Sequence, residues 1–295
     1  MAKLNSSLKR DITHISYPSN RKRNDYWAGY MPFKITEKPI DYKDKYVGEK
    51  EDIIFLNNSY IVSKDPQHIF PLIFGGITLF IALYFLSILY FSDIWSISNT
   101  IILIICTSSV IFFTIYYFTM PLKQVIFDRY NGLITFPGFL WNRPITMKFE
   151  SIRMLHAGGA LGSPTADMLY VKRPDRIIGS KYMLHVGGNL DTNLSFIVWY
   201  MDKNRPLPDG DAFDDYRKKD YKRRKEEGFP PPLFRTFIPT DEFKLKWQIE
   251  RDKHWKDIIS TNQNGDISHQ LWQSPENIAL HGGMERSCSA VNLEF

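Results

Sequence analysis

Two apolar stretches decide the fold of this chain: IFPLIFGGITLFIALYFLSILYF, Ile69–Phe91, and ISNTIILIICTSSVIFFTIYYFTM, Ile97–Met120. Asp93 is the only charged residue between Ile69 and Leu122, whereas the core of a soluble protein seldom contains so long a stretch without a charge. Each stretch has the length that a helix needs to cross about 30 Å of hydrocarbon. The sequence therefore predicts two transmembrane helices rather than the alternative, a pair of buried helices in a soluble core.

The residues around the two stretches predict the orientation of the helices. Pro71 fits the first turn of a helix, and Pro121 should end the second helix. The connecting segment SDIWSIS contains no Lys or Arg, whereas both flanking segments contain them, so the positive-inside rule places both termini in the cytoplasm. We expect a multi-pass protein of the bacterial inner membrane, with an antiparallel helical hairpin and three aromatic anchors at the membrane interface: Trp95, Tyr116 and Tyr117.

The segment 121–202 alternates short apolar runs with turn residues. QVIFDRY-NG-LITF predicts a hairpin, because Asn131 and Gly132 both tolerate a positive φ. Further strand-like runs are ITMKF, SIRMLHA, MLYVKR, YMLHV and SFIVWYM. Before the first span, IIFL-NN-SYIV predicts a hairpin that joins the same sheet, since an isolated hairpin is marginal in water. The predicted fold class is therefore an α+β membrane protein with a cytoplasmic antiparallel β domain of about seven strands, a small barrel or sandwich, with a pleckstrin-like fold as one form.

Two helices are predicted after the β domain. The first spans Asp211–Gly228, with Gly228 just beyond its end, and the second begins with Thr240 as N-cap. The second helix has a partly apolar face that we expect to pack on the sheet, formed by Phe243, Trp247, Glu250, His254 and Ile258, with Trp255 and Ile259 alongside. The predicted order is a flexible basic arm (1–52), a β-hairpin (53–68), the transmembrane hairpin (69–120, spans 69–91 and 97–120), the β domain (121–202), a helical region (203–260) and a flexible tail (261–295).

Basic residues gather in two places. One is the N-terminal arm and the other is the first C-terminal helix, and the residues are Arg21, Lys22, Arg23, Lys218, Lys219, Lys222, Arg223, Arg224 and Lys225. Each could contribute about 1 kcal/mol near an anionic membrane surface. The helix also contains acidic residues, so a solvated, salt-bridged helix is an equal alternative. A net charge of +5 without a recognition motif argues against a nucleic-acid partner.

The sequence contains no pattern typical of catalysis or metal binding. The seven histidines form no HExxH motif or Cys/His set at zinc spacing, and the Gly-rich segments lack the spacing of a phosphate-binding loop. The acidic residues 209–215 fit helix capping better than a calcium loop. Cys106 and Cys288 are predicted to be free thiols in a reducing compartment. We therefore expect no enzyme activity, no catalytic residue, no cofactor and no metal.

The run WYMDKNRPLPDGDAFDDYRKKDYKRRKEEGFPPPLF, Trp199–Phe234, together with FDRYNGLITFPG, resembles an uncharacterised bacterial family of membrane proteins with two spans and a cytoplasmic domain of unknown function. The resemblance would cover about residues 53–260 and supplies no catalytic residues. It implies a link to type VI-like toxin-secretion loci and a role as an immunity or accessory protein.

Two functions follow as hypotheses. The first is a non-enzymatic inner-membrane protein that binds a protein partner, a toxin or a secretion component. The alternative is an anionic-lipid-binding module in envelope maintenance. Membrane lipids are partners in both cases. Homo-oligomerisation stays open, because Gly75 and Gly76 allow close helix approach without forming a GxxxG motif.

Overall fold

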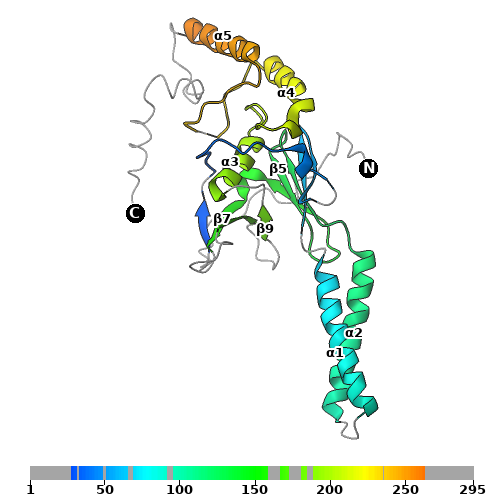
Figure 1. Ribbon diagram of the computed structural model, residues 1–295. Coiled ribbons are helices and arrows are strands. Elements are labelled where there is room, and N and C mark those ends of the chain that lie inside the picture. Colours follow the sequence, from blue (N-terminus) through cyan, green and yellow to red (C-terminus); the bar gives the residue numbers. More distant parts are fainter. Residues whose placement is uncertain are drawn as a thin grey trace, which may run out of the picture. The chain divides into compact units, whose positions relative to one another are not determined.

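The structure, a computed structural model, describes residues 28–31, 33–48, 51–65, 69–91, 96–158, 167–172, 181–184, 189–234 and 236–262. These residues divide into two units (Figure 1). The hairpin unit comprises residues 64–125 and 136–145, and the α+β unit comprises the other described residues. Four of the predicted site residues lie outside the described ranges: Arg21, Lys22, Arg23 and Trp95.

Two helices, α1 (Phe70–Phe91) and α2 (Ile97–Thr119), lie side by side in the hairpin unit (Figure 1). Both are long and apolar enough to cross a membrane, which confirms the predicted helices. Ser96 caps α2 by accepting a hydrogen bond from a backbone N–H of the first turn at 3.4 Å. Gly75 permits the close approach of the helices, because a Cβ there would lie 3.3 Å from the Cβ of Phe113.

A five-stranded antiparallel sheet contains both predicted hairpins. Its order is β2-β3-β4-β5-β6, and the strands are β2 (Ile53–Leu56), β3 (Tyr60–Lys64), β4 (Gln124–Asp128), β5 (Leu133–Phe136) and β6 (Ile145–Lys148). The hairpin that precedes α1 joins the later sheet, as predicted. The Asn131-Gly132 turn is confirmed between β4 and β5, with Gly132 at φ +62°, a conformation that glycine adopts without steric cost.

A second antiparallel sheet combines an N-terminal strand with three strands that follow the short 3-10 helix η3 (Phe149–Ser151). Its order is β1-β7-β8-β9, and the strands are β1 (Ala28–Met31), β7 (Arg153–Gly158), β8 (Asp167–Lys172) and β9 (Lys181–Leu184). The strands β7, β8 and β9 confirm predicted runs. They belong to a separate sheet, however, rather than to one sheet of about seven strands. The barrel or pleckstrin-like arrangement stays a prediction.

Within the predicted flexible arm (1–52), the structure describes residues 28–31, 33–48 and 51–52, and these described residues are packed against the rest of the α+β unit. Strand β1 pairs along its length with β7, and the segment after it places Ile35 and Tyr42 in the core. A short 3-10 helix, η1 (Asp44–Tyr46), follows. The basic and polar composition of the arm suggests a flexible segment, because its few apolar side chains do not stand out in the sequence. The burial of these side chains stabilises the ordered conformation.

The predicted strand at Ser195–Met201 is wrong, because these residues belong to the helix α3 (Leu190–Met201). Asn189 caps α3, and its side-chain oxygen accepts a hydrogen bond from the N–H of Thr192 at 2.8 Å. All residues from Asn193 to Met201 are buried. A helix that is buried on every face lacks the periodicity that distinguishes it from a buried strand.

The first C-terminal helix agrees with its prediction. A 3-10 turn, η4 (Asp211–Phe213), leads into α4 (Asp214–Glu226). Gly228, at φ +76°, lies just beyond the C-cap, as predicted. The N–H of Phe229 donates to the carbonyl oxygen of Arg224 at 2.7 Å, which closes the end of the helix.

The last helix, α5 (Leu245–Asn262), corrects two predictions. It begins after Thr240, which is therefore not its N-cap. Its apolar face packs on α4 rather than on the sheet, since Trp255 joins Tyr221 and Phe229 in a small core. The Trp247 ring stacks on that of Tyr221, with centroids 4.5 Å apart.

Gly210, just before η4, tests how closely this segment packs against the backbone of Tyr42 in the N-terminal segment. At φ +120°, a Cβ at residue 210 would lie 2.0 Å from the carbonyl oxygen of Tyr42. We expect Gly210→Ala to destabilise the protein by about 2 kcal/mol or more, because the backbone conformation and the contact both disfavour a side chain. Thermal unfolding of the detergent-solubilised chain measures this. Gly48→Ala is the matched control, since a Cβ there meets nothing within 4 Å. Equal losses in the two variants would contradict the explanation.

Candidate functional site

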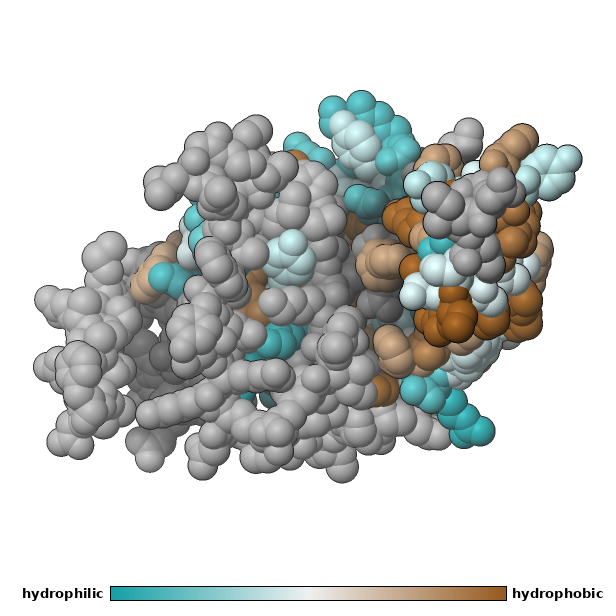
Figure 2. Space-filling view, turned by 90° about the horizontal axis from the view of Figure 1, so that it is seen from below, coloured by the Kyte–Doolittle hydropathy of each residue, from teal (hydrophilic) through white to brown (hydrophobic). Residues whose placement is uncertain are grey.

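The lateral surface of the hairpin unit is the largest apolar feature of the described residues. Most large apolar side chains of α1 and α2 are exposed, for example Phe80 at 76% and Phe118 at 79%. Figure 2 shows this hydrophobic surface in brown. Soluble proteins rarely expose contiguous apolar patches beyond a few hundred Å². The hairpin surface is therefore suited to an apolar environment rather than to water.

The predicted aromatic anchors differ in exposure. Tyr117 is exposed at the end of α2, whereas Tyr116 is buried. The Tyr116 ring packs edge-on against Trp141, with centroids 5.0 Å apart, and stacks with Phe112 at 6.3 Å. Tyr116 therefore packs α2 against the loop that contains Trp141, and of these two tyrosines only Tyr117 is exposed.

The predicted basic surface of α4 is only partly present. Arg224 is buried and pairs with two carboxylates, so it cannot contact a membrane surface, and the prediction for this residue is corrected. Arg223 is four-fifths buried and bonds Glu227 at 2.6 Å. The remaining lysines of the set are exposed: Lys218, Lys219, Lys222 and Lys225.

Two of these lysines take part in exposed ion pairs. Lys222 lies 3.7 Å from Glu226, and Lys225 lies 2.6 Å from Glu250. Exposed pairs contribute little to stability. The four lysines thus remain a positively charged surface whose ion pairs can open at little cost.

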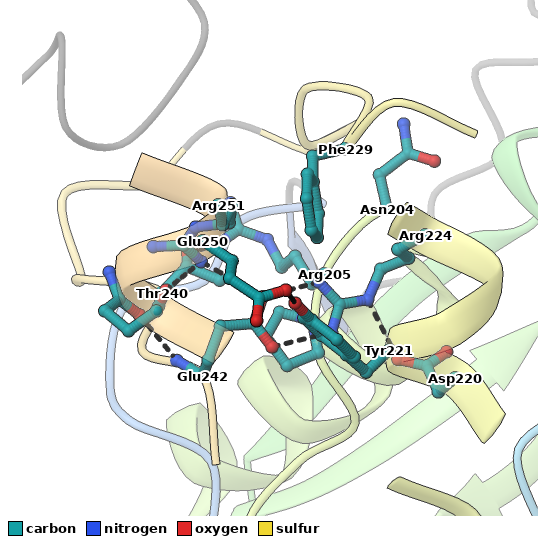
Figure 3. A network of polar contacts seen from close by, with 12 residues as sticks. Asn204, Arg205, Asp220, Tyr221, Arg224, Phe229, Thr240, Glu242, Glu250 and Arg251 are labelled. Carbon is teal, nitrogen blue, oxygen red and sulfur yellow. Dashed lines mark hydrogen bonds and ion pairs between the residues drawn. The ribbon is translucent and has the colours of Figure 1, made fainter. Parts of the chain in front are cut away.

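A buried ionic cluster, which the sequence did not reveal, lies beneath this surface. It joins the ends of β4 and α3 to α4 and α5, and its members are Arg129, Asp202, Arg205, Asp220, Arg224, Glu242 and Arg251. Figure 3 shows most of these side chains converging between the two C-terminal helices. Burying an unpaired charge is costly, so the pairing of the cluster decides whether the elements can pack.

Asp220 is the centre of the cluster. Its carboxylate accepts a hydrogen bond from Arg129 Nη1 at 2.7 Å and another from Arg224 Nε at 2.9 Å. The other edge of the Arg224 guanidinium donates two bonds to Glu242, at 2.6 and 2.8 Å. Such bidentate pairs fix geometry as well as supplying energy. The segment before α5 is thereby held to α4.

Arg205 and Asp202 extend the cluster to the end of α3. Arg205 Nε donates to Asp202 at 3.2 Å, and Arg205 Nη2 donates to the carbonyl oxygen of Phe234 at 2.7 Å. The hydroxyl of Thr240 accepts a further bond from Arg205, while the Thr240 carbonyl oxygen accepts one from Arg251 at 2.5 Å. Thr240 thus accepts hydrogen bonds from two arginines instead of capping a helix.

Burial and pairing act against each other on the pKa values of the cluster. Burial by itself raises the pKa of Asp220, but Arg129, Arg224 and Arg223 outweigh burial and leave the pKa below its ordinary value. For Asp202, burial prevails over Arg205 and the pKa is raised. Asp220 is therefore the carboxylate whose charge the cluster stabilises most clearly.

The geometry of the described residues favours a structural role for this cluster rather than catalysis. Each carboxylate is occupied by guanidinium or backbone donors, and no nucleophile lies beside a free base. No group of three or more His, Cys, Asp or Glu among the described residues could hold a metal ion. His254 Nε2 lies 3.0 Å from the carbonyl oxygen of Gly228 and so bonds the loop that follows α4.

A second candidate surface lies on the segment between α4 and α5 and on the first turns of α5. Large apolar side chains are exposed along residues 233–249, which we call the apolar segment: Leu233, Phe237, Phe243, Leu245 and Ile249. Two of the positions predicted to pack on the sheet differ in burial: Phe243, which precedes α5, is exposed, and Trp247 on α5 is partly buried. Exposed apolar side chains of this kind are typical of surfaces that bind other proteins.

Comparison with known proteins gives no match: no family model, no curated protein and no solved structure resembles the chain.

Asp220→Asn tests the ionic cluster. The amide cannot balance the buried charges of Arg129 and Arg224, so we expect a loss of about 3–5 kcal/mol in the free energy of unfolding. Urea-induced unfolding of the detergent-solubilised chain, followed by tryptophan fluorescence, measures this loss. Glu226→Gln breaks only the exposed pair with Lys222 and should cost less than about 1 kcal/mol. A cost for Asp220→Asn no larger than for this control would refute the assignment.

The destabilisation caused by Asp220→Asn should depend on pH. Because the folded-state pKa of Asp220 lies below its ordinary value of 3.8, ionised Asp220 stabilises the fold fully above that pH. This stabilisation is lost as the pH falls through the lower folded-state value. The stability difference between the wild type and Asp220→Asn should therefore shrink below pH 3.8. Unfolding titrations at neutral and acidic pH measure the difference, and one that is constant with pH would contradict the prediction.

Proposed function

We propose that this protein is a non-enzymatic, membrane-anchored binding protein of the bacterial inner membrane. The single observation that carries the proposal is the exposed apolar surface of α1 and α2. In lipid, the free-energy cost of exposing this apolar surface to water disappears. The hydrogen bonds along each helix also satisfy its backbone groups internally. The α+β unit would then face the cytoplasm, and the basic residues on both sides of the hairpin support this orientation.

The proposed partner of the α+β unit is another protein. The apolar segment supports this, because its exposed rings and aliphatic side chains can be buried by a partner. The class of partner that we propose, a toxin or a secretion component, is the one expected from the sequence of Trp199–Phe234, and the comparisons with known proteins do not test it. The protein would then act in immunity or as an accessory protein.

The membrane topology can be tested with single cysteines. In a Cys106→Ala, Cys288→Ala background, Ile97→Cys at the exposed start of α2 should react with a membrane-impermeant maleimide on intact cells whose outer membrane is permeabilised. Lys218→Cys on α4 should react only after the inner membrane is opened. The reverse pattern would contradict the orientation. Recovery of the chain in the soluble fraction without detergent would contradict the anchoring.

The partner can be tested by co-expression with toxin genes that neighbour the gene for this chain. We expect one of them to inhibit growth and the full chain to restore it. Leu245→Ser combined with Ile249→Ser should abolish this protection, because it removes exposed apolar contacts without touching the core. Lys218→Ser combined with Lys219→Ser is the matched control and should protect normally. No protection against any neighbouring toxin would count against the immunity role.

The exposed lysines of α4 favour a second candidate function, contact with anionic lipid. Lys218, Lys219, Lys222 and Lys225 could together contribute a few kcal/mol at about 1 kcal/mol each. Hydrogen exchange of α4 in nanodiscs of anionic and of zwitterionic lipid distinguishes the two functions. Protection that appears only with anionic lipid, and disappears when the four lysines become glutamine, would favour the lipid-binding function.

A further inference from the structure

The loop between β5 and β6 carries apolar side chains that the core of the protein does not use. Its sequence is PGFLWNRP, residues 137–144. The side chain of Phe139 is 47% exposed and that of Trp141 is 46% exposed. Two large aromatic residues on an eight-residue connection are unusual for a loop in water, where polar turn residues predominate. We call this segment the aromatic loop.

The aromatic loop has a defined backbone conformation. A Cβ at Gly138 would lie 2.1 Å from the carbonyl oxygen of Asn142, so only glycine allows the loop to fold back this closely. Leu140 has a φ of +48°. The N–H of Asn142 donates to the carbonyl oxygen of Phe139 at 2.9 Å. These features make the loop a tight turn, in which Phe139 and Trp141 are each about half exposed.

A buried lysine fixes the loop from the inside. Lys123 Nζ donates to the carbonyl oxygens of Gly138 at 2.5 Å and Leu140 at 2.6 Å. Burial lowers the pKa of Lys123, and the negative charge of Asp65 partly offsets this. A buried ammonium group is costly unless it is hydrogen-bonded, so Lys123 favours the loop conformation that supplies these two carbonyl groups.

The loop lies against the end of α2. Trp141 Nε1 donates to the hydroxyl of Thr119 at 2.9 Å. The Trp141 ring also meets the rings of Tyr116 and Phe112 edge-on, at 5.0 and 5.9 Å between centroids. These three partners occupy the last turns of α2, the end that the proposed topology places at the cytoplasmic membrane surface. Both the helix and the loop belong to the hairpin unit.

We infer that the aromatic loop is a third membrane contact beside the two helices, with Phe139 and Trp141 entering the boundary between lipid headgroups and acyl chains. The amphipathic indole ring favours this region, because it offers apolar contact with access to polar partners, and the apolar ring of Phe139 can be buried at the same boundary. The apolar surface of α2 continues into the loop through the Trp141 contacts, so the occupant is the same lipid that surrounds the helix. The inference rests on the proposed anchoring of the hairpin.

Depth-dependent quenching tests the inference. In the full chain with Cys106→Ala and Cys288→Ala, Phe139→Cys is labelled with the fluorophore NBD and reconstituted into phosphatidylcholine vesicles that contain nitroxide lipids. We expect stronger quenching by a nitroxide near the headgroup than by one deep in the acyl chain. A label at Ile105→Cys, exposed in the middle of α2, should show the opposite order.

The two labels separate the outcomes. No quenching at residue 139 with deep quenching at residue 105 would overturn the inference and leave the anchoring intact. No quenching at either residue would overturn the anchoring as well. Quenching at residue 139 that is strongest for the deep nitroxide would overturn the interfacial position.

Lys123→Met provides a second measurement. The variant loses both bonds to the loop carbonyls, so shallow quenching at residue 139 should fall at least twofold while quenching at residue 105 stays unchanged. Lys64→Met, which replaces a half-buried lysine on β3, is the matched control and should leave both signals as they are. An unchanged signal at residue 139 in Lys123→Met would show that Lys123 does not position the loop.

Discussion

The pairing of Asp220 with Arg129 and Arg224 is the interaction on which the arrangement of the α+β unit depends. The three side chains come from α4 and from the end of β4, and all are buried. Removing such charges from water costs several kcal/mol for each ion, and only well-placed counter-charges and hydrogen bonds recover that cost. Few alternative packings would place the donors and acceptors together. The cluster therefore makes the positions of α3, α4 and α5 mutually dependent.

The two units meet the cost of desolvating charge in opposite ways. The helices of the hairpin unit contain no ionisable Asp, Glu, Lys or Arg at all, so they can leave water as a whole. The α+β unit buries arginines and acids but pairs them. The arginines also use their flat faces, since the Arg205 guanidinium lies 5.0 Å above the Trp199 ring and that of Arg251 lies 5.1 Å above Trp255.

Local signals in the sequence predicted a large part of the fold. Length and the absence of charge gave the two helices, and Asn131-Gly132 and Gly228 marked a turn and a helix end. The failures have physical causes. Helix α3 is buried on all sides and so lacks the amphipathic period, and β1 depends on a partner more than a hundred residues away in the chain.

The candidate sites were less predictable than the fold. Charged residues in a sequence look alike whether they face water or each other, and Arg224 was assigned to a surface because nothing local distinguishes it from Lys225. The ionic cluster needs Arg129 and Glu242, which only the tertiary fold brings to α4. Trp141 could have been suspected, because an aromatic pair between Gly138 and Pro144 is rare in a polar loop, but its contact with α2 arises only from the fold.

The burial of Lys123 and Arg129 has a consequence for biogenesis. The positive-inside rule counts these two residues among the cations that favour the proposed cytoplasmic position of the chain after α2, yet in the folded protein both are buried. In the proposed topology the same cations would therefore have two roles. In the unfolded chain they would favour the orientation of α2, and in the folded protein Lys123 and Arg129 are internal hydrogen-bond donors.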